Sequence, residues 1–114
     1  MKRDLDLIRK ILLSIESGKE EDLSDYAPEV CNYHRALVIE AGLALGHIHE
    51  GANGMPDAVL IQRLTWEGHE YLDAIRSEDI WEKTKRTFKQ QGLAMTLELV
   101  KTVALKVATD LLFG

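Results

Sequence analysis

The chain has 114 residues, of which 46% are hydrophobic and 29% charged, and this size fits one domain that buries a core without disulfides or a structural metal. The single cysteine, Cys31, excludes an internal disulfide, and no apolar run follows the charged start MKRDLD as a signal peptide requires, so we expect a cytoplasmic protein. The net charge of −5 is concentrated in residues 1–57, which hold 11 acidic and 6 basic groups, and it argues against non-specific adhesion to nucleic acid.

The first half of the chain carries two predicted helices. Apolar residues recur at helical spacing over residues 4–17, where Asp4 is positioned to cap the helix and Gly18 to end it. After the acidic stretch KEEDLSDY, a proline and a glutamate suit the first turn of a second helix over residues 28–41. We expect Gly42 to end this second helix.

The segment that follows predicts a β-hairpin. LALGHIHE, residues 43–50, and AVLIQRL, residues 58–64, are typical of short strands, and the turn GANGMPD between them breaks regular structure. The two strands are therefore expected to pair across a loose tip.

Helical spacing returns after the hairpin. Thr65 is positioned to cap a helix, and Gly68 in its first turn would let that helix approach the hairpin closely. The apolar side of this helix is predicted to carry Trp66, His69, Leu72 and Ile75. Asp79 and Glu82 form a capping-box-like pair that opens a further helix, which Gly92 ends.

A last helix is predicted over residues 96–113. Its apolar positions alternate at spacings of three and four, which is typical of a heptad seam that packs against another helix. We therefore predict a partner-binding seam, with a homodimer through this helix as one possibility, at Leu97, Val100, Ala104, Val107 and Leu111. The alternative is that this apolar stripe folds back on the chain's own first helix, and the sequence leaves both interpretations open. Charged residues interrupt the segment, so it is not expected to span a membrane.

The order helix, helix, hairpin, helix indicates a mainly α fold with a two-stranded β-hairpin, of the α+β class, arranged like a winged helix with additional C-terminal helices. We expect a single domain, with a winged-helix-like core over residues 1–77 and a helical extension over residues 78–114. In a winged helix the helix before the hairpin lies in the major groove of DNA, and the hairpin reaches the backbone or minor groove.

Three strings carry a resemblance to a known family: MKRDLDLIRKILLSIE at the start, YHRALVIEAGL in the middle and RLTWEGHEYLDAIRSEDIWEKTK later. They are similar to a family of bacterial and prophage proteins, the domain of unknown function 2513, over most of residues 1–88. The resemblance implies a winged-helix-like fold and a bacterial or phage setting. It implies no catalytic residues, because the family has no settled activity.

Two groups of side chains are candidates for nucleic-acid binding. Asn32 and Arg35 share a face of the helix before the hairpin, and Asn and Arg are the residue types that read adenine and guanine. Basic side chains that could hold phosphates cluster on a later helix, at Lys83, Lys85, Arg86 and Lys89. Both groups have an alternative interpretation as solvated or packed side chains of ordinary helix faces.

No catalytic site is predicted, and neither a cofactor nor a metal is expected. His69 and Glu70 begin like the zinc-protease motif HExxH, but the second histidine of that motif is missing. Side chains that suit zinc by type, although their spacing matches no dense zinc motif, are Cys31, His34, His47 and His49. The sequence also contains no glycine-rich phosphate loop and no nucleophile elbow, so we do not expect an enzyme.

Two function classes remain open. The first is a small transcription regulator, a winged-helix dimer that binds double-stranded DNA. The second is an interaction module of phage or mobile-element origin that uses its acidic surface, KEEDLSDY in particular, to bind a basic host protein, for example in a defence complex. The fold alone does not choose between them.

Overall fold

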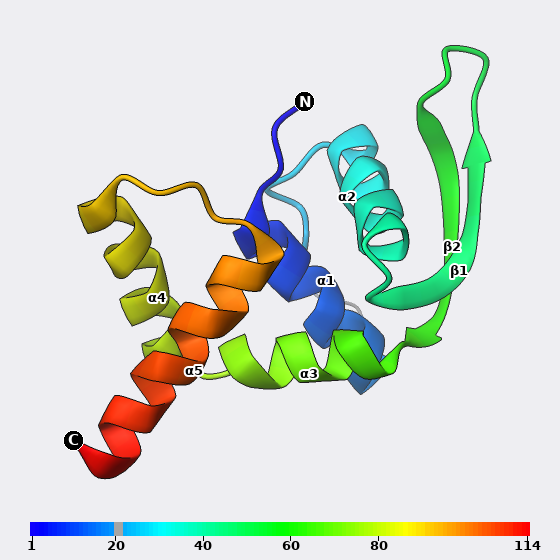
Figure 1. Ribbon diagram of the computed structural model, residues 1–114. Coiled ribbons are helices and arrows are strands. Elements are labelled where there is room, and N and C mark those ends of the chain that lie inside the picture. The colour runs from blue at the N-terminus through cyan, green and yellow to red at the C-terminus, as the bar shows by residue number, and fades with distance from the viewer. Residues whose placement is uncertain (20–21) are drawn as a thin grey trace. The chain divides into compact units, whose positions relative to one another are not determined.

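The computed structural model describes residues 1–19 and 22–114, which form two compact units, Met1–His69 and Glu70–Gly114. The chain is mainly helical with one antiparallel two-stranded hairpin in its described part, so the predicted α+β class is confirmed. Figure 1 shows the elements in the predicted order of helix, helix, hairpin and further helices. The division into a core over residues 1–77 and an extension over residues 78–114 stays a prediction.

The first unit begins with helix α1, Leu5–Ser17, whose start is capped as predicted. The Asp4 carboxylate accepts a hydrogen bond from the backbone N–H of Leu7 at 3.1 Å, which satisfies one of the free donors of the first turn. Helix α2, Pro28–Glu40, opens with proline in its first turn. The glycines predicted to end helices all adopt a positive φ: Gly18, Gly42 and Gly92.

The hairpin is formed by β1, Ala44–Glu50, and β2, Pro56–Leu64. The strands pair with His47 opposite Leu60 and Ile48 opposite Val59, and the register shifts between Leu45 and Gly46. The hairpin, α1 and α2 all contact one another. The largest buried side chains from the two helices are Leu7, Leu12, His34 and Val38.

The junction between β2 and helix α3, Trp66–Ile75, is held by Thr65. Its hydroxyl donates to the carbonyl of Gly42 at 2.5 Å and accepts from the backbone N–H of Gly68 at 3.0 Å, so one side chain caps α3 and ties it to the end of α2. A Cβ added at Gly68 would overlap the backbone carbonyl of Leu43. Both predictions for this turn, the Thr65 cap and the close approach at Gly68, are confirmed.

The predicted apolar side of α3 is wrong in its first turn. Trp66 is 74% exposed, and the His69 side chain is 52% exposed beside Glu16, at 4.0 Å. Leu72 and Ile75 are buried as predicted. The reason is geometric: Gly68 packs against the backbone of Leu43, just before β1, and in this orientation of the helix Trp66 and His69 are exposed.

The second unit is built from the end of α3 and helices α4, Glu78–Gln91, and α5, Leu97–Phe113. The cap of α4 is Ser77, whose hydroxyl accepts from the N–H of Ile80 at 3.4 Å, and not the predicted Asp79. Thr96 caps α5 in the same way. Helices α4 and α5 pack together, and the side chains they bury are Trp81, Thr84, Phe88, Val100 and Ala104.

Candidate functional site

One member of the basic cluster on α4 already interacts with neighbouring side chains. Lys85 lies 3.2 Å from the Glu82 carboxylate, and its ammonium lies 5.6 Å from the centre of the Trp81 ring. Lys83, Arg86 and Lys89 are exposed. Lys85, Arg86 and Lys89 line an open groove of about 370 Å³, but Glu82 lines it too and dilutes its positive field. The cluster could contact a phosphate with two or three of its four predicted members.

The predicted seam of α5 is divided between a packed half and an exposed half. Val100 and Ala104 are fully buried within the second unit, while Leu97 and Val107 are half-buried. Leu111 is 56% exposed, because the helix continues beyond the residues that cover its first turns. The seam is therefore not a free surface along its whole length, and the part that stays accessible is its C-terminal end.

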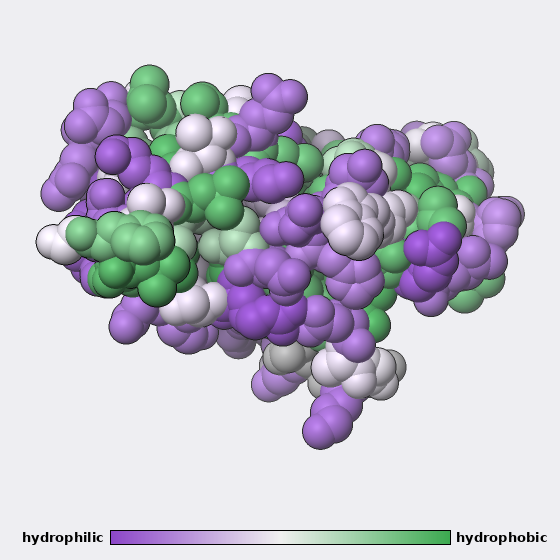
Figure 2. Space-filling view, turned by 60° about the horizontal axis from the view of Figure 1, so that its bottom comes forward, coloured by the Kyte–Doolittle hydropathy of each residue, from purple (hydrophilic) through white to green (hydrophobic). Residues whose placement is uncertain are grey.

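Large apolar side chains are exposed in the C-terminal half of α5. Leu105 is 50% exposed, Leu112 is 76% exposed and Phe113 is 85% exposed. Figure 2 shows hydrophobic residues gathered at the surface on the side where α5 ends. A groove of about 390 Å³ adjoins this face, lined by Glu70, Asp73, Ala74, Ile80, Lys101, Leu105 and Ala108. Contiguous exposed apolar surface of this kind marks interaction sites in water.

The two candidate base-reading residues on α2 are turned toward the rest of the first unit. The Asn32 amide donates to the backbone carbonyl of Asp57 in the hairpin at 3.3 Å. One Arg35 nitrogen, Nη1, donates to the Asn32 side-chain oxygen at 3.4 Å, and both residues are half-buried. The exposed positions of α2 include Glu29 and Glu40, which would meet DNA phosphates with like charge.

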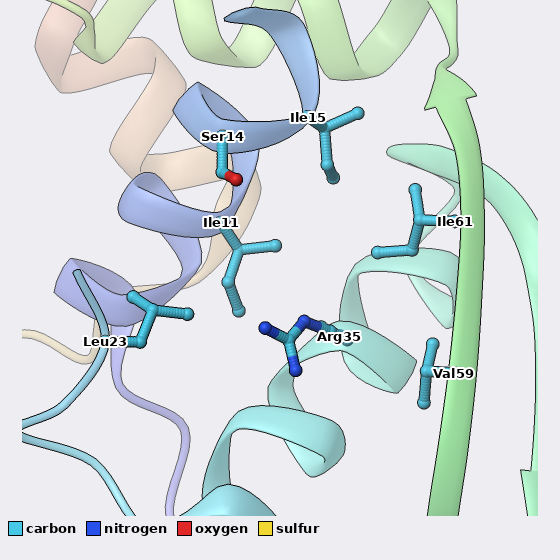
Figure 3. Close-up of a pocket in the computed structure, with 7 residues that line it drawn as sticks. All are labelled: Ile11, Ser14, Ile15, Leu23, Arg35, Val59 and Ile61. Carbon is cyan, nitrogen blue, oxygen red and sulfur yellow. The ribbon is translucent and has the colours of Figure 1, made fainter. Parts of the chain in front are cut away.

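Arg35 enters an open pocket of about 200 Å³ between α1, α2 and β2. Figure 3 shows its guanidinium among the hydrocarbon side chains of Ile11, Leu23 and Ile61. The remaining lining residues are Ser14, Ile15 and Val59. Sequence reasoning placed Arg35 on α2 but missed the pocket. The alternation of β2, which puts Val59 and Ile61 on one face, was the available signal.

The predicted zinc-type residues are not brought together. His34 is 1% exposed and uses both ring nitrogens: Nε2 accepts from the Asp4 N–H at 2.8 Å, and Nδ1 lies 2.8 Å from the carbonyl of Val30. Cys31 is buried on the same helix, while His47 and His49 are exposed on the hairpin. In the described ranges 1–19 and 22–114 no group of three His, Cys, Asp or Glu side chains is arranged to hold a metal.

His49 forms a close pair with Asp57 near the tip of the hairpin. Its Nδ1 lies 2.6 Å from Oδ1 of Asp57, and both side chains are mostly exposed. The hydrogen bond to Asp57, with the negative charge of that carboxylate, raises the pKa of His49 above its ordinary value of 6.5. The pair links the two strands of the hairpin through their side chains.

The acidic stretch KEEDLSDY was predicted as a surface for a basic partner. Its residues 20 and 21 lie outside the described residues, so the structure does not describe the complete stretch. In the described part of the stretch Asp22 accepts from the backbone N–H of Ser24 at 3.0 Å, and the hydrogen bonds to Ser24 lower the pKa of Asp22. Among the helices that the structure describes, none has the length and apolar character needed to cross a bilayer.

Comparison with known proteins places the chain in a family. Residues 2–94 match the family described as Hypothetical protein (DUF2513). The chain is also 35% identical over 119 aligned residues to a Haemophilus influenzae protein that carries the name Uncharacterized protein, and the match covers 98% of this chain and 99% of that protein. No solved structure gives a significant match. The chain belongs to the DUF2513 family.

Proposed function

We propose that this protein is a non-enzymatic interaction module whose α5 helix binds a second copy of the chain. The observation that carries the proposal is the unsupported C-terminal half of α5, where Leu105, Leu112 and Phe113 are each at least half exposed. Burying apolar surface contributes a favourable free energy of about 25 cal/mol per Å². The exposed apolar end of α5 therefore favours association with another apolar surface. The buried free thiol of Cys31 suits a reducing compartment, and we place this activity in the cytoplasm.

Charge favours a second copy as the occupant of this face. Residues 70–114 contain seven acidic and seven basic side chains, whereas residues 1–69 contain twelve acidic and seven basic ones. Two copies of the second unit therefore meet without net repulsion. A strongly basic partner would instead be attracted to the first unit, which carries the net negative charge.

The spacing along α5 also fits a helix partner. Lys101, Leu105, Ala108 and Leu112 follow one another at steps of four, three and four, which places them on one side of the helix. The exposed Lys106 and Asp110, 3.9 Å apart, lie on another part of the helix surface and keep that part polar. A mixed surface of this kind gives a helix pair an apolar centre with a charged rim.

The test is the molar mass in solution, measured by light scattering over a concentration series. The wild-type chain is expected to reach twice the chain mass as concentration rises. The double variant Leu105→Glu, Leu112→Glu is expected to stay monomeric, because each substitution would bury a charge in the contact.

The matched control is Thr102→Glu, Thr109→Glu, which adds the same charge at the same spacing of seven residues on α5. Thr102 and Thr109 are exposed, and their hydroxyls donate to backbone carbonyls within the helix. This control is expected to dimerise like the wild type. A wild-type mass of one chain at every concentration would overturn the proposal.

The basic cluster on α4 favours a second candidate function, DNA binding by a transcription regulator. Its support is the exposure of Lys83, Arg86 and Lys89 on one helix. The measurement is binding of the protein's own upstream DNA at two salt concentrations. If the cluster holds phosphates, Arg86→Ala weakens binding to all sequences and lowers the salt slope by about one. Binding that is absent at low salt rules this candidate out.

A further inference from the structure

We propose that the pocket around Arg35 binds a small monocarboxylic acid with a short branched or aromatic hydrocarbon chain. This site lies wholly within the first unit and is independent of the α5 surface. The carboxylate would pair with the Arg35 guanidinium, and the hydrocarbon chain would lie against Ile11, Ile15 and Ile61. The proposal therefore adds a ligand site to a protein that acts through its second unit.

The first step of the argument is the hydrogen bonding of Arg35. A guanidinium presents five N–H donors, and a half-buried one is stabilised when an anion accepts several of them. Arg35 makes a single hydrogen bond in the described residues, at 3.4 Å to Asn32, and Asn32 is neutral. No described carboxylate lies within ion-pair distance of Arg35. Most of its donors therefore have no acceptor among the described residues, and the side chain that carries them lines the pocket.

The second step is the contrast between the guanidinium and the walls. Five of the seven lining side chains are Ile, Leu or Val, contributed by α1, the loop before α2, and β2. Ser14 adds a hydroxyl, but this donates to the carbonyl of Lys19 at 2.8 Å. One cation in a hydrocarbon pocket matches a ligand with a single anionic head and an apolar body.

The third step limits the charge of the ligand. Among the described residues that line the pocket, Arg35 is the cationic one, and residues 1–69 carry five more acidic than basic side chains. A dianion such as a phosphate monoester would enter a region of negative potential with one compensating charge. A carboxylate carries one negative charge, which the single positive charge of Arg35 balances. Its two oxygens also match the two parallel N–H donors of a guanidinium.

The fourth step is size. The pocket of about 200 Å³ is somewhat larger than an apolar cavity of ~150 Å³, which is known to hold one benzene molecule. A ligand of roughly five to eight carbon atoms is therefore expected to fill it. Longer acyl chains would extend out of the open side of the pocket into water, so the added carbon atoms would contribute little to the affinity.

The experiment titrates the full chain with 4-methylpentanoate and follows methyl signals by NMR. We expect saturable shifts at the methyl groups of Ile11, Ile15 and Ile61, and none at Val100 in the second unit. The neutral analogue 4-methylpentanamide is expected to bind at least about tenfold more weakly, because it cannot form the charged pair. Inorganic phosphate is expected to cause no saturable shift at these methyl groups.

Arg35→Gln is expected to remove the preference for the acid over the amide. The matched control is Arg63→Gln, because Arg63 lies on β2 outside the pocket and donates to the backbone carbonyl of Leu64 at 3.0 Å. The control is expected to keep the wild-type preference. The acid–amide comparison on the wild-type chain needs no variant to fold.

Three results would overturn the proposal. The first is an absence of saturable shifts with the acid. The second is equal binding of acid and amide by the wild type, which would show that the guanidinium takes no part. The third is an unchanged acid preference in a folded Arg35→Gln variant. None of these results bears on dimerisation through α5, so the two proposals fail separately.

Discussion

Buried His34 links the two helices of the first unit through its ring. Because Nδ1 points at the carbonyl of Val30, it carries the proton and donates, which leaves Nε2 to accept from the Asp4 N–H. Asp4 is therefore held twice: its side chain caps α1, and its backbone N–H is satisfied by α2. The sequence offered His34 as a possible metal ligand, whereas the packed helices use it as a neutral connector.

His34→Phe is expected to lower the free energy of unfolding by about 1–3 kcal/mol, because it keeps an aromatic ring in the core but leaves the part-buried Asp4 N–H without its acceptor. The measurement is a urea titration. His47→Phe, at an exposed position of the hairpin, is the control and is expected to change stability by no more than about 0.5 kcal/mol. Equal effects of the two substitutions would contradict the role assigned to His34.

The raised pKa of His49 gives the hairpin a defined pH dependence. A group whose pKa is higher in the folded chain contributes stability that is fully present below its unfolded pKa, near 6.5, and is lost as the pH rises through the folded pKa. Asp57→Asn is expected to lower the pKa of His49 in an NMR titration, because it removes the carboxylate that favours the charged ring. An unchanged pKa of His49 in that variant would contradict the assigned interaction between His49 and Asp57.

At the scale of elements, the turn from β2 to α3 determines which side of α3 is buried. Thr65 fixes the start of the helix by bonding both Gly42 and Gly68, and the missing side chain of Gly68 lets the helix lie against the Leu43 carbonyl. That contact explains why Trp66 is exposed although its spacing from Leu72 suggested a shared apolar side. Local backbone packing therefore outweighs the hydrophobic pattern at this turn.

Gly68→Ala is expected to destabilise the first unit by about 1–3 kcal/mol or more, because the added methyl group overlaps a backbone carbonyl that has no rotamer to change. Thermal unfolding measures the effect. Glu67→Ala, one residue earlier and exposed, is the control and is expected to be nearly neutral. If Gly68→Ala were as stable as the control, the close approach at Leu43 would be wrong.

At the scale of the whole molecule, the two units differ in net charge. The first unit carries the whole net charge of −5, and the second unit is neutral with an exposed apolar helix end. Both proposed activities, association through α5 and phosphate binding by the α4 cluster, lie on the second unit, but they depend on different physical interactions. Apolar association through α5 is weakly screened by salt, whereas phosphate contacts of the α4 cluster are strongly screened.

Dimerisation of the wild-type chain is therefore expected to be unchanged or strengthened when salt is raised from low to high concentration. The same light-scattering series, repeated at two salt concentrations, checks this. A dimer that dissociates at high salt would show that charged groups and not α5 leucines hold the two copies together.

Much of the secondary structure could be predicted because its causes are local. Caps such as Asp4 and Thr65, helix-ending glycines, and the apolar spacing of α1 and α5 all act within one or two turns of chain. The α4 cap was misplaced because Ser77 and Asp79 are both good capping residues, and local sequence does not rank them. The alternation of β2 indicates that Val59 and Ile61 share a face, but the Arg35 pocket itself could not be predicted, since its lining also comes from α1, α2 and a loop.

The sequence by itself determined the α+β class, the order of the elements, the family and the charge difference between the two halves. These depend on residue type, spacing and composition. Tertiary structure alone decided that Arg35 faces a hydrocarbon pocket, that His34 connects two helices, and that α5 buries Val100 but leaves Leu112 exposed. Each of these outcomes depends on which distant segment covers a given face, and a helical or strand period does not specify that segment.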